Sequence, residues 1–523
     1  MALDILIKNG TVIDGVGTPA YHADIAIKSG KIEKIGFLGD PGAETVIDAV
    51  GQYVSPGFID INNASDRHWA LFNHPLSESL LYQGVTTIIG GNCGSSLAPL
   101  TTGNTIATIQ KWADIKKINV NWLTLSDFFE EIKTKKLLLN FGTLIGHATL
   151  RRNVVGDEFR GLTEPELAQM KHLLQEALTE GALGFSTGLS YSHANVADEN
   201  EIISLVSTIE SKRNFYSTHL RNEGDMLYES VLEAIDTAKK TKVGIEISHF
   251  KAVEKNNWPL FDKSLEAILK ASEEGIDINF DVYPYSSTAT VFYTLLPSWI
   301  AMGGRMKLIE NLKNFELRKR AVKEMEGKEE NFSDIIIASG NIDKTFIGKT
   351  IGMISKNQGV GILETVINLL IAAEGKLIVF WQALSEENFI KALKNPLSII
   401  ASDGSAYNLG DASEGYLAHP RSFGCFPRIL SRYVREKNII SLEEAIKKMT
   451  ALPALKLGLY DRGIIRPRFF ADITIWSPDT IKDLASFENP FQYAQGIHSV
   501  IINGQVALSN GQITNRVQGH ILL

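Results

Sequence analysis

Four side chains of the kinds that bind metals or move protons each follow a short apolar run: Cys93, His219, His249 and Asp403. Such runs are typical of buried parallel strands, so each side chain is expected at or just beyond a strand end. Thiolate and imidazole donors suit zinc, and imidazoles from neighbouring strands can converge on one ion. The pattern predicts a metal site formed by the cysteine and the two histidines, with the aspartate facing it.

Each of these residues has a simpler interpretation when it is taken alone. A single histidine at a strand end is more often structural, and a free cysteine is usually a small buried apolar side chain. Asp403 precedes Gly404 in a common turn dipeptide. As a carboxylate facing the site, it would instead bind metal or take the proton of an attacking water. Two histidines at successive strand ends favour the metal interpretation for the whole set.

Three further polar side chains lie next to the same strand ends: Lys251, Tyr283 and Arg421. The planar fork of an arginine matches the geometry of a carboxylate, so Arg421 and Lys251 are candidates to hold a substrate carboxylate. For either residue alone, a solvated surface charge is an equally good interpretation.

The middle of the chain alternates apolar runs with helical stretches. Runs at 86–91, 139–147, 182–188, 215–219, 243–249 and 276–283 are separated by helical patterns such as 164–180 and 264–274. This alternation is typical of a parallel α/β fold, and at this length we predict a (β/α)8 TIM-like barrel. Active sites in such barrels lie at the C-terminal strand ends, where the candidate residues are.

The two ends of the chain share a different pattern, with short β-branched runs between glycine-containing turns. We therefore predict one small β-sandwich domain from residues 1–54 and 456–523. The barrel is assigned to 55–296 and 351–455, with the runs 376–380 and 397–404 resuming its strands. The charged helical stretch 297–350 is predicted to be an inserted small subdomain.

Composition restricts the class of protein. The 523 residues are 44% apolar and 21% charged, as in ordinary soluble enzymes. A formal charge of −8 and the lack of a basic stripe argue against a nucleic-acid partner. We find no secretory signal pattern and no apolar stretch of the roughly 18–20 residues that a membrane span needs. A cytoplasmic protein with no membrane partner is expected.

The candidate residues fall within motifs that resemble the N-acyl-D-amino-acid deacylases (D-aminoacylases) of the amidohydrolase superfamily, almost end to end. The matching segments include SerProGlyPheIleAsp (55–60), GlyAsnCysGlySerSerLeuAlaPro (91–99), GlyPheSerThrGlyLeuSerTyr (184–191), ThrHisLeuArgAsnGluGly (218–224), IleSerHisPheLys (247–251), AspValTyrProTyr (281–285), SerAspGly (402–404) and HisProArgSerPheGly (419–424). The segment around Cys93 is fairly specific for this branch.

The resemblance implies a barrel with a composite β-sandwich and an inserted subdomain. It implies a zinc ion on Cys93, His219 and His249, with Asp403 as the catalytic acid and base. Recognition of the substrate would fall to four further residues, the last three near the α-carboxylate: Tyr191, Lys251, Tyr283 and Arg421. The implied reaction is attack of water, polarised by zinc, on the acyl amide of a small N-acyl amino acid or related amide, which releases a carboxylate and a D-amino acid.

One segment departs from the family. Where the family has a His-x-His pair, this chain has Asn62-Asn63-Ala64, and His68 is a poor substitute. Because the pair serves mainly a second, weaker metal position, one zinc ion is expected here. The alternative is a non-hydrolytic or repurposed amidohydrolase-fold protein that has lost the second metal position. The other site residues are all present, which favours a modified catalyst.

Overall fold

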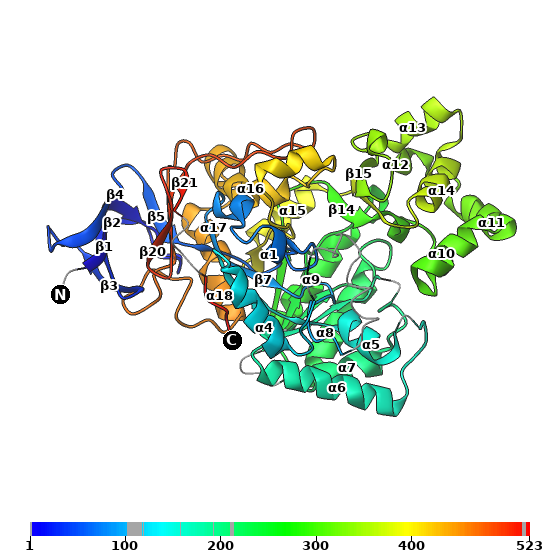
Figure 1. The fold of residues 1–523 in the computed structure, drawn as a ribbon, viewed down its shortest axis with the longest axis horizontal. Helices are drawn as coiled ribbons and strands as arrows, with labels where there is room; N and C mark the ends of the chain where they lie inside the picture. Colours follow the sequence, from blue (N-terminus) through cyan, green and yellow to red (C-terminus); the bar gives the residue numbers. More distant parts are fainter. Residues whose placement is uncertain are drawn as a thin grey trace.

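Three regions follow one another along the long axis of the molecule (Figure 1). A β-sheet unit lies at one end, parallel strands with their helices lie in the middle, and a small unit of helices and short strands lies at the other end. This computed structural model describes residues 3–101, 118, 120–156, 158–191, 193–209, 214–514 and 519–523.

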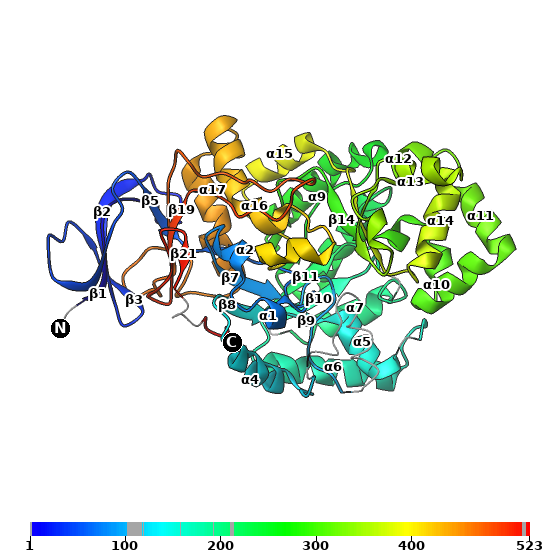
Figure 2. The same cartoon turned by 45° about the horizontal axis from the view of Figure 1, so that its top comes forward.

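The sheet at one end combines strands from both ends of the chain. Its order is β21-β20-β19-β18-β5-β1-β2-β3, with β4 also paired to β1. β5 joins the two halves because it pairs parallel with β1 and antiparallel with β18. In Figure 2 the blue strands from the start of the chain lie next to the red strands from its end. The strands are β1 (Leu3–Val12), β2 (Tyr21–Lys28), β3 (Lys31–Gly36), β4 (Ala43–Asp48), β5 (Tyr53–Pro56), β18 (Ile473–Trp476), β19 (Ile497–Ile502), β20 (Gln505–Ser509) and β21 (Gln512–Ile513).

The central strands form two parallel sheets. One has the order β6-β7-β8 and the other β17-β13-β12-β11-β10-β9. Every residue of these strands is buried, as expected for parallel strands covered on both faces. Their bounds are β6 (Phe58–Asp60), β7 (Val85–Gly90), β8 (Asn140–Thr143), β9 (Ile145–Gly146), β10 (Gly184–Gly188), β11 (Phe215–His219), β12 (Ile245–Ile247), β13 (Ile278–Val282) and β17 (Ser398–Ile400).

The two parallel sheets meet on both sides. Leu144 alone separates β8 from β9. On the other side, the Asp403 N–H donates to the Asn62 carbonyl at 2.9 Å, and the Ala64 N–H donates to the Gly404 carbonyl at 2.7 Å. The residues that follow β17 are therefore hydrogen-bonded to those that follow β6.

Helices connect these strands, and the predicted helices 164–180 and 264–274 are confirmed as parts of α6 and α9. A capping box of Thr163 and Glu166 begins α6, which buries Met170 and Leu174 against the strands. The helices around the central strands are α1 (Ala70–Asn73), α2 (Glu78–Leu81), α4 (Leu125–Lys135), α5 (His147–Val155), α6 (Glu164–Thr179), α7 (Glu199–Val206), α8 (Leu227–Thr241), α9 (Leu260–Glu273), α15 (Glu386–Lys394), α16 (Arg421–Arg428), α17 (Leu442–Met449) and α18 (Ala451–Lys456).

The unit at the other end has its own core, with buried residues from Phe292 to Ala383. The run 376–380, expected to resume the barrel strands, forms most of β16 and pairs antiparallel with β14 and β15, so that expectation was wrong. An apolar run can form a strand in a parallel sheet or in an antiparallel sheet, and the sequence does not show which strands it pairs with. The elements are β14 (Thr288–Val291), β15 (Ile336–Gly340), β16 (Leu377–Trp381), α10 (Gly304–Lys313), α11 (Phe315–Met325), α12 (Glu329–Ser333), α13 (Ile351–Gln358) and α14 (Ile362–Ala372).

Among the described residues, no helix combines the length and the apolar character that crossing a bilayer requires.

Candidate metal centre

The predicted cysteine and histidines lie together at the strand ends. Cys93 follows β7, His219 ends β11 and His249 follows β12, and all three are buried. One ligand atom from each lies within 4.8 Å of the others. The His249 Nε2 atom is 3.5 Å from the Cys93 Sγ atom and 2.9 Å from the His219 Nδ1 atom. The structure thus brings the three residues to one point.

The donor set has the chemistry and the spacing of a zinc site. Two donors bound to one tetrahedral zinc at about 2.0–2.3 Å lie roughly 3.3–3.8 Å apart, close to the separations found here. Burial would raise the pKa of the Cys93 thiol, but the Arg67 guanidinium and the His249 imidazolium hold it well below its usual range. This direction favours the thiolate, which is the form that binds metal.

The backbone at the site is strained. Cys93, His249 and Asp403 have φ angles of 52°, 40° and 45°, in the left-handed region that favours glycine. Such a conformation costs about 1–3 kcal/mol for a residue with a side chain and is common at functional sites. The Cys93 loop also needs Gly188 in β10, because a Cβ atom there would lie 2.3 Å from the Cys93 carbonyl oxygen.

Glu223 completes the surroundings of the imidazoles, and the sequence-based prediction missed it. Its carboxylate lies 3.0 Å from the His249 Nδ1 atom, 3.7 Å from the His219 Nε2 atom and 2.5 Å from the Lys251 Nζ atom. Burial would raise the pKa of Glu223, but Lys251 and the two imidazoles hold it well below its usual range. A carboxylate on the far nitrogen of a ligand histidine fixes the ring and its tautomer. The feature of the sequence that could have identified Glu223 is its position four residues after His219.

Asp403 faces the centre as a charged carboxylate. It lies 2.9 Å from the Arg421 Nη2 atom and 3.6 Å from the Arg67 Nη2 atom. Burial alone would raise the pKa of Asp403, but Arg421, the His249 imidazolium and Arg67 lower it. The group is therefore able to accept a proton at neutral pH.

Arg421 and Tyr283 lie beside this carboxylate with free hydrogen-bonding capacity. The Arg421 guanidinium carbon is 4.7 Å from the centre of the Tyr283 ring. The Arg421 Nε and Nη1 atoms and the Tyr283 hydroxyl are buried without a hydrogen-bond partner among the described residues. The predicted substrate residues on this side are thus together and available.

Lys251 and Tyr191 lie beside the two histidines of the centre. The Lys251 Nζ atom contacts the His249 Nδ1 atom at 2.7 Å in addition to Glu223. The Tyr191 ring is tilted against the His219 ring with a centroid distance of 5.0 Å. Lys251 is therefore part of a network rather than a free surface charge.

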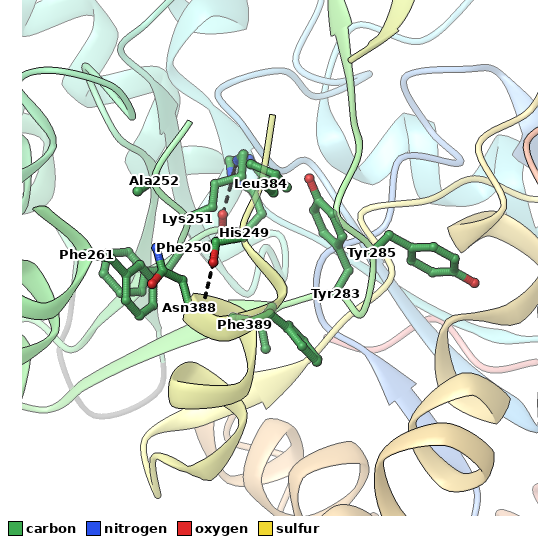
Figure 3. Close-up of a pocket in the computed structure, with 12 residues that line it drawn as sticks. His249, Phe250, Lys251, Ala252, Phe261, Tyr283, Tyr285, Leu384, Asn388 and Phe389 are labelled. Atoms are coloured by element: carbon green, nitrogen blue, oxygen red, sulfur yellow. Dashed lines mark hydrogen bonds between the residues drawn. The ribbon is translucent and has the colours of Figure 1, made fainter. Parts of the chain in front are cut away.

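A small cavity of about 30 Å³ adjoins the histidine side of the centre. Figure 3 shows Tyr283 and Tyr285 in its wall with their rings pointing in different directions. The Tyr285 hydroxyl donates to the Pro420 carbonyl at 3.4 Å, so its role is structural. The other lining residues are His249, Phe250, Lys251, Ala252, Phe261, Val282, Leu384, Ser385, Asn388 and Phe389.

The segment Asn62-Asn63-Ala64 makes contacts within the fold. The Asn62 side chain donates to the Asp281 carboxylate at 3.0 Å, and the Asn63 side chain donates to the Asp60 carboxylate at 2.8 Å. Ala64 contributes only its backbone. His68 is not one of the three clustered residues. Its pKa falls to about 4 because of burial and the charges of Arg67 and Arg421.

Arg67 is the second residue that the sequence-based prediction missed. It follows Ala64 by three positions, yet its guanidinium lies at the centre beside Asp403. Its Nε atom is buried without a hydrogen-bond partner among the described residues. Its sequence neighbours, Asp66 and His68, gave no sign of this placement.

Comparison with known proteins identifies the family of the chain. Residues 400–508 match the family described as "Amidohydrolase family". The chain is 30% identical over 521 residues to a D-aminoacylase of Alcaligenes xylosoxydans xylosoxydans, covering 99% of this chain and 97% of that protein. The chain belongs to the D-aminoacylase family. An N-acyl-D-glutamate deacylase of the same organism is 30% identical over 96% of this chain and 93% of its own length. The predicted resemblance is confirmed.

Solved structures of D-aminoacylase relatives are similar over the whole chain. The N-acyl-D-glutamate deacylase of Bordetella bronchiseptica, complexed with zinc and a phosphonate inhibitor that mimics the tetrahedral intermediate, is 29% identical with a TM-score of 0.85 and covers 100% of both chains. A D-aminoacylase described by its binuclear metal centre, with one-metal activation and second-metal attenuation, is 29% identical with a TM-score of 0.84 over 99% of both chains.

Proposed function

We propose that this chain hydrolyses the acyl amide of N-acyl-D-amino acids, or a related linear amide, to a carboxylate and a D-amino acid, with one zinc ion per chain. The observation that carries the proposal is the convergence of the Cys93, His219 and His249 donor atoms within 4.8 Å. Family membership over the whole chain supports the same reaction.

The residues have separate roles in the proposed reaction. A zinc ion held by Cys93, His219 and His249 would act as a Lewis acid toward the acyl carbonyl and the attacking water. Asp403 takes the proton from that water and delivers it to the leaving nitrogen, as a general base and then a general acid. Arg421 holds Asp403 as a carboxylate, which keeps it ready for the first proton transfer.

Recognition of the substrate is assigned to the groups around Asp403. The free Nε and Nη1 donors of Arg421 suit the α-carboxylate, and the Tyr283 hydroxyl lies on the same side. Lys251 adds positive charge from the other side, although Glu223 balances part of it. Tyr191 packs beside His219, where it orients the acyl end of the substrate.

The two parallel sheets are proposed to be one closed (β/α)8 barrel. The supporting contacts are the single-residue gap at Leu144 and the hydrogen bonds that join the ends of β6 and β17. The division into a β-sandwich from 1–54 and 456–523 and a barrel interrupted by an insertion remains a proposal with it. The separate core from Phe292 to Ala383 supports an insertion longer than the predicted 297–350, which takes 351–383 out of the predicted barrel range.

A second candidate function is a non-hydrolytic or repurposed protein on the same fold. The observation that favours it is the hydrogen bonding of Asn62 to Asp281 where relatives supply an imidazole. The retained donors and the retained Asp403 favour hydrolysis.

Metal analysis of the purified protein, with assays of D-amino acid release, separates the candidates. We expect about one zinc ion per chain and release from N-acetyl-D-methionine, -phenylalanine, -glutamate or -aspartate. Cys93→Ala or His249→Ala should abolish both. Cys425→Ala is the matched control, because the thiol of this buried cysteine donates to the Ala401 carbonyl and is not one of the three clustered donors, so the variant should keep the zinc. A folded protein without zinc would support the non-hydrolytic role, and zinc without release would support a different substrate.

A further inference from the structure

We infer that the Arg67 guanidinium occupies the place of the second metal ion and limits this centre to one zinc. The inference rests on the proposed function for the single zinc site, and goes beyond it by assigning a role to a residue outside the predicted set. In the binuclear D-aminoacylase described above, a second metal attenuates the activity. Here a side chain of fixed charge would take that position.

The position of Arg67 is set by its neighbour. The Asp66 carboxylate accepts hydrogen bonds from the Gly91 N–H at 2.6 Å and from the Arg67 N–H at 2.7 Å. Gly91 lies two residues before Cys93, so this contact ties the segment after β6 to the cysteine loop. The segment is held where Arg67 can reach the centre.

The guanidinium lies beside the Asp403 carboxylate at the centre. Its Nη2 atom is 3.6 Å from the Asp403 Oδ1 atom, and its side chain is only 19% exposed. Its charge also lowers the pKa of the Cys93 thiol. A fixed cation thus already pairs with an anionic group on which a second metal ion at this centre would depend.

The charge balance explains why an arginine suits this place. Buried anions are costly unless a cation pairs with them. The charges of one Zn²⁺ ion, the Cys93 thiolate and the Asp403 carboxylate sum to zero, so the Arg67 guanidinium gives the loaded centre an additional positive charge. Arginine keeps its charge at every physiological pH, and its planar guanidinium donates hydrogen bonds to a carboxylate without transferring a proton to it. The same fixed charge repels a second divalent cation.

The other ligands of a second metal are missing as well. Asn62 uses its amide N–H to hold Asp281, and Ala64 has no donor atom in its side chain. The lack of imidazoles and the presence of a guanidinium therefore both act against the binding of a second zinc ion. We expect an enzyme whose activity excess zinc does not attenuate.

Zinc titration by equilibrium dialysis with elemental analysis tests the inference. The full-length protein should bind one zinc ion even in large excess zinc. Asn62→His with Ala64→His should still bind one, because Arg67 remains. Adding Arg67→Asn to that pair should raise the count to two. The matched control adds Arg320→Asn to the pair instead; Arg320 lies in α11 and pairs with Glu324 far from the centre, so the count should stay at one.

Two results would overturn the inference: two tightly bound zinc ions in the unaltered protein, or two in the Asn62→His, Ala64→His variant that keeps Arg67. The zinc count of the unaltered protein needs no variant. The inference can therefore be contradicted even if one of the variants does not fold. Zinc counting also separates this inference from the proposed function. One zinc without amide hydrolysis contradicts the function alone, and two zinc ions with hydrolysis contradict the inference alone.

Discussion

The two sides of the centre differ in what their side chains do. On the side of β11 and β12, His219 and His249 each bring a ring nitrogen within 4.8 Å of the Cys93 sulfur, and Glu223 lies 3.0 Å from the His249 Nδ1 atom. On the side of β6, Asn62 is tied into hydrogen bonds within the fold. The first side keeps the donors of a metal site together with the group that orients them.

The backbone hydrogen bonds at the end of β6 are formed even though its side chains offer no imidazole. The Asn62 carbonyl accepts from the Asp403 N–H, and the Ala64 N–H donates to Gly404. Neither contact depends on a side chain. The end of β6 can therefore lack metal-binding side chains while its backbone still holds the segment of Asp403 in place. The comparison teaches that fold and ligand set are separable at this position.

The largest expected effect comes from the group shared by the two sides. Asp403→Asn should lower kcat by about 10²–10⁴-fold, the range that general acid–base catalysis contributes, with zinc content unchanged. The measurement is steady-state kinetics on an N-acetyl-D-amino acid beside metal analysis. Activity within a few-fold of the unaltered protein would remove Asp403 from the mechanism.

The intact side should depend on its supporting carboxylate. Glu223→Gln should weaken zinc binding by about 10–100-fold, the usual cost of removing the partner of a ligand histidine. Competition with a chelator measures the change. Glu233→Gln is the control, because Glu233 pairs with Arg221 and does not touch the imidazoles. Equal zinc affinity in the two variants would contradict the role given to Glu223.

Arg421→Gln tests the electrostatic link to Asp403. Arg421 lowers the pKa of that carboxyl, so its removal raises the pKa. Asp403 acts as a base only when deprotonated, so the acidic limb of the kcat profile should move to higher pH. We also expect KM to rise about tenfold, from the loss of roughly 1.4 kcal/mol in a charge-assisted contact.

Arg428→Gln is the matched control for that variant. Arg428 lies in the same helix, packs over Tyr285 and pairs with Asp483, away from the centre. Its pH profile should match that of the unaltered protein. An acidic limb that moves equally in both variants would show a general effect of the helix.

The smallest effect on activity is expected on the altered side. Asn62→Ala should lower the free energy of unfolding by about 1–3 kcal/mol, because the buried Asp281 carboxylate loses its hydrogen-bond donor. Zinc content should not change. Urea denaturation with metal analysis measures both, and loss of the zinc would show that Asn62 belongs to the metal site.

Much of the fold and most of the candidate site were predictable from local pattern. Buried parallel strands appear as continuous apolar runs, so the positions of His219 and His249 followed from where those runs end. The antiparallel pairing of β16 did not follow from the sequence, because an apolar run does not show which strand it pairs with. Glu223 and Arg67 lie in irregular segments, where spacing along the chain does not fix side-chain direction.

By itself, the sequence determined the kinds of donor that exist, their places at strand ends, and the lack of imidazoles at Asn62 and Ala64. Only the tertiary structure decided which other side chain from this segment reaches the centre. Arg67 reaches Asp403 because Asp66 anchors its segment to Gly91, 25 residues further along the chain. Long-range hydrogen bonds set that direction, and no local pattern in the sequence encodes them.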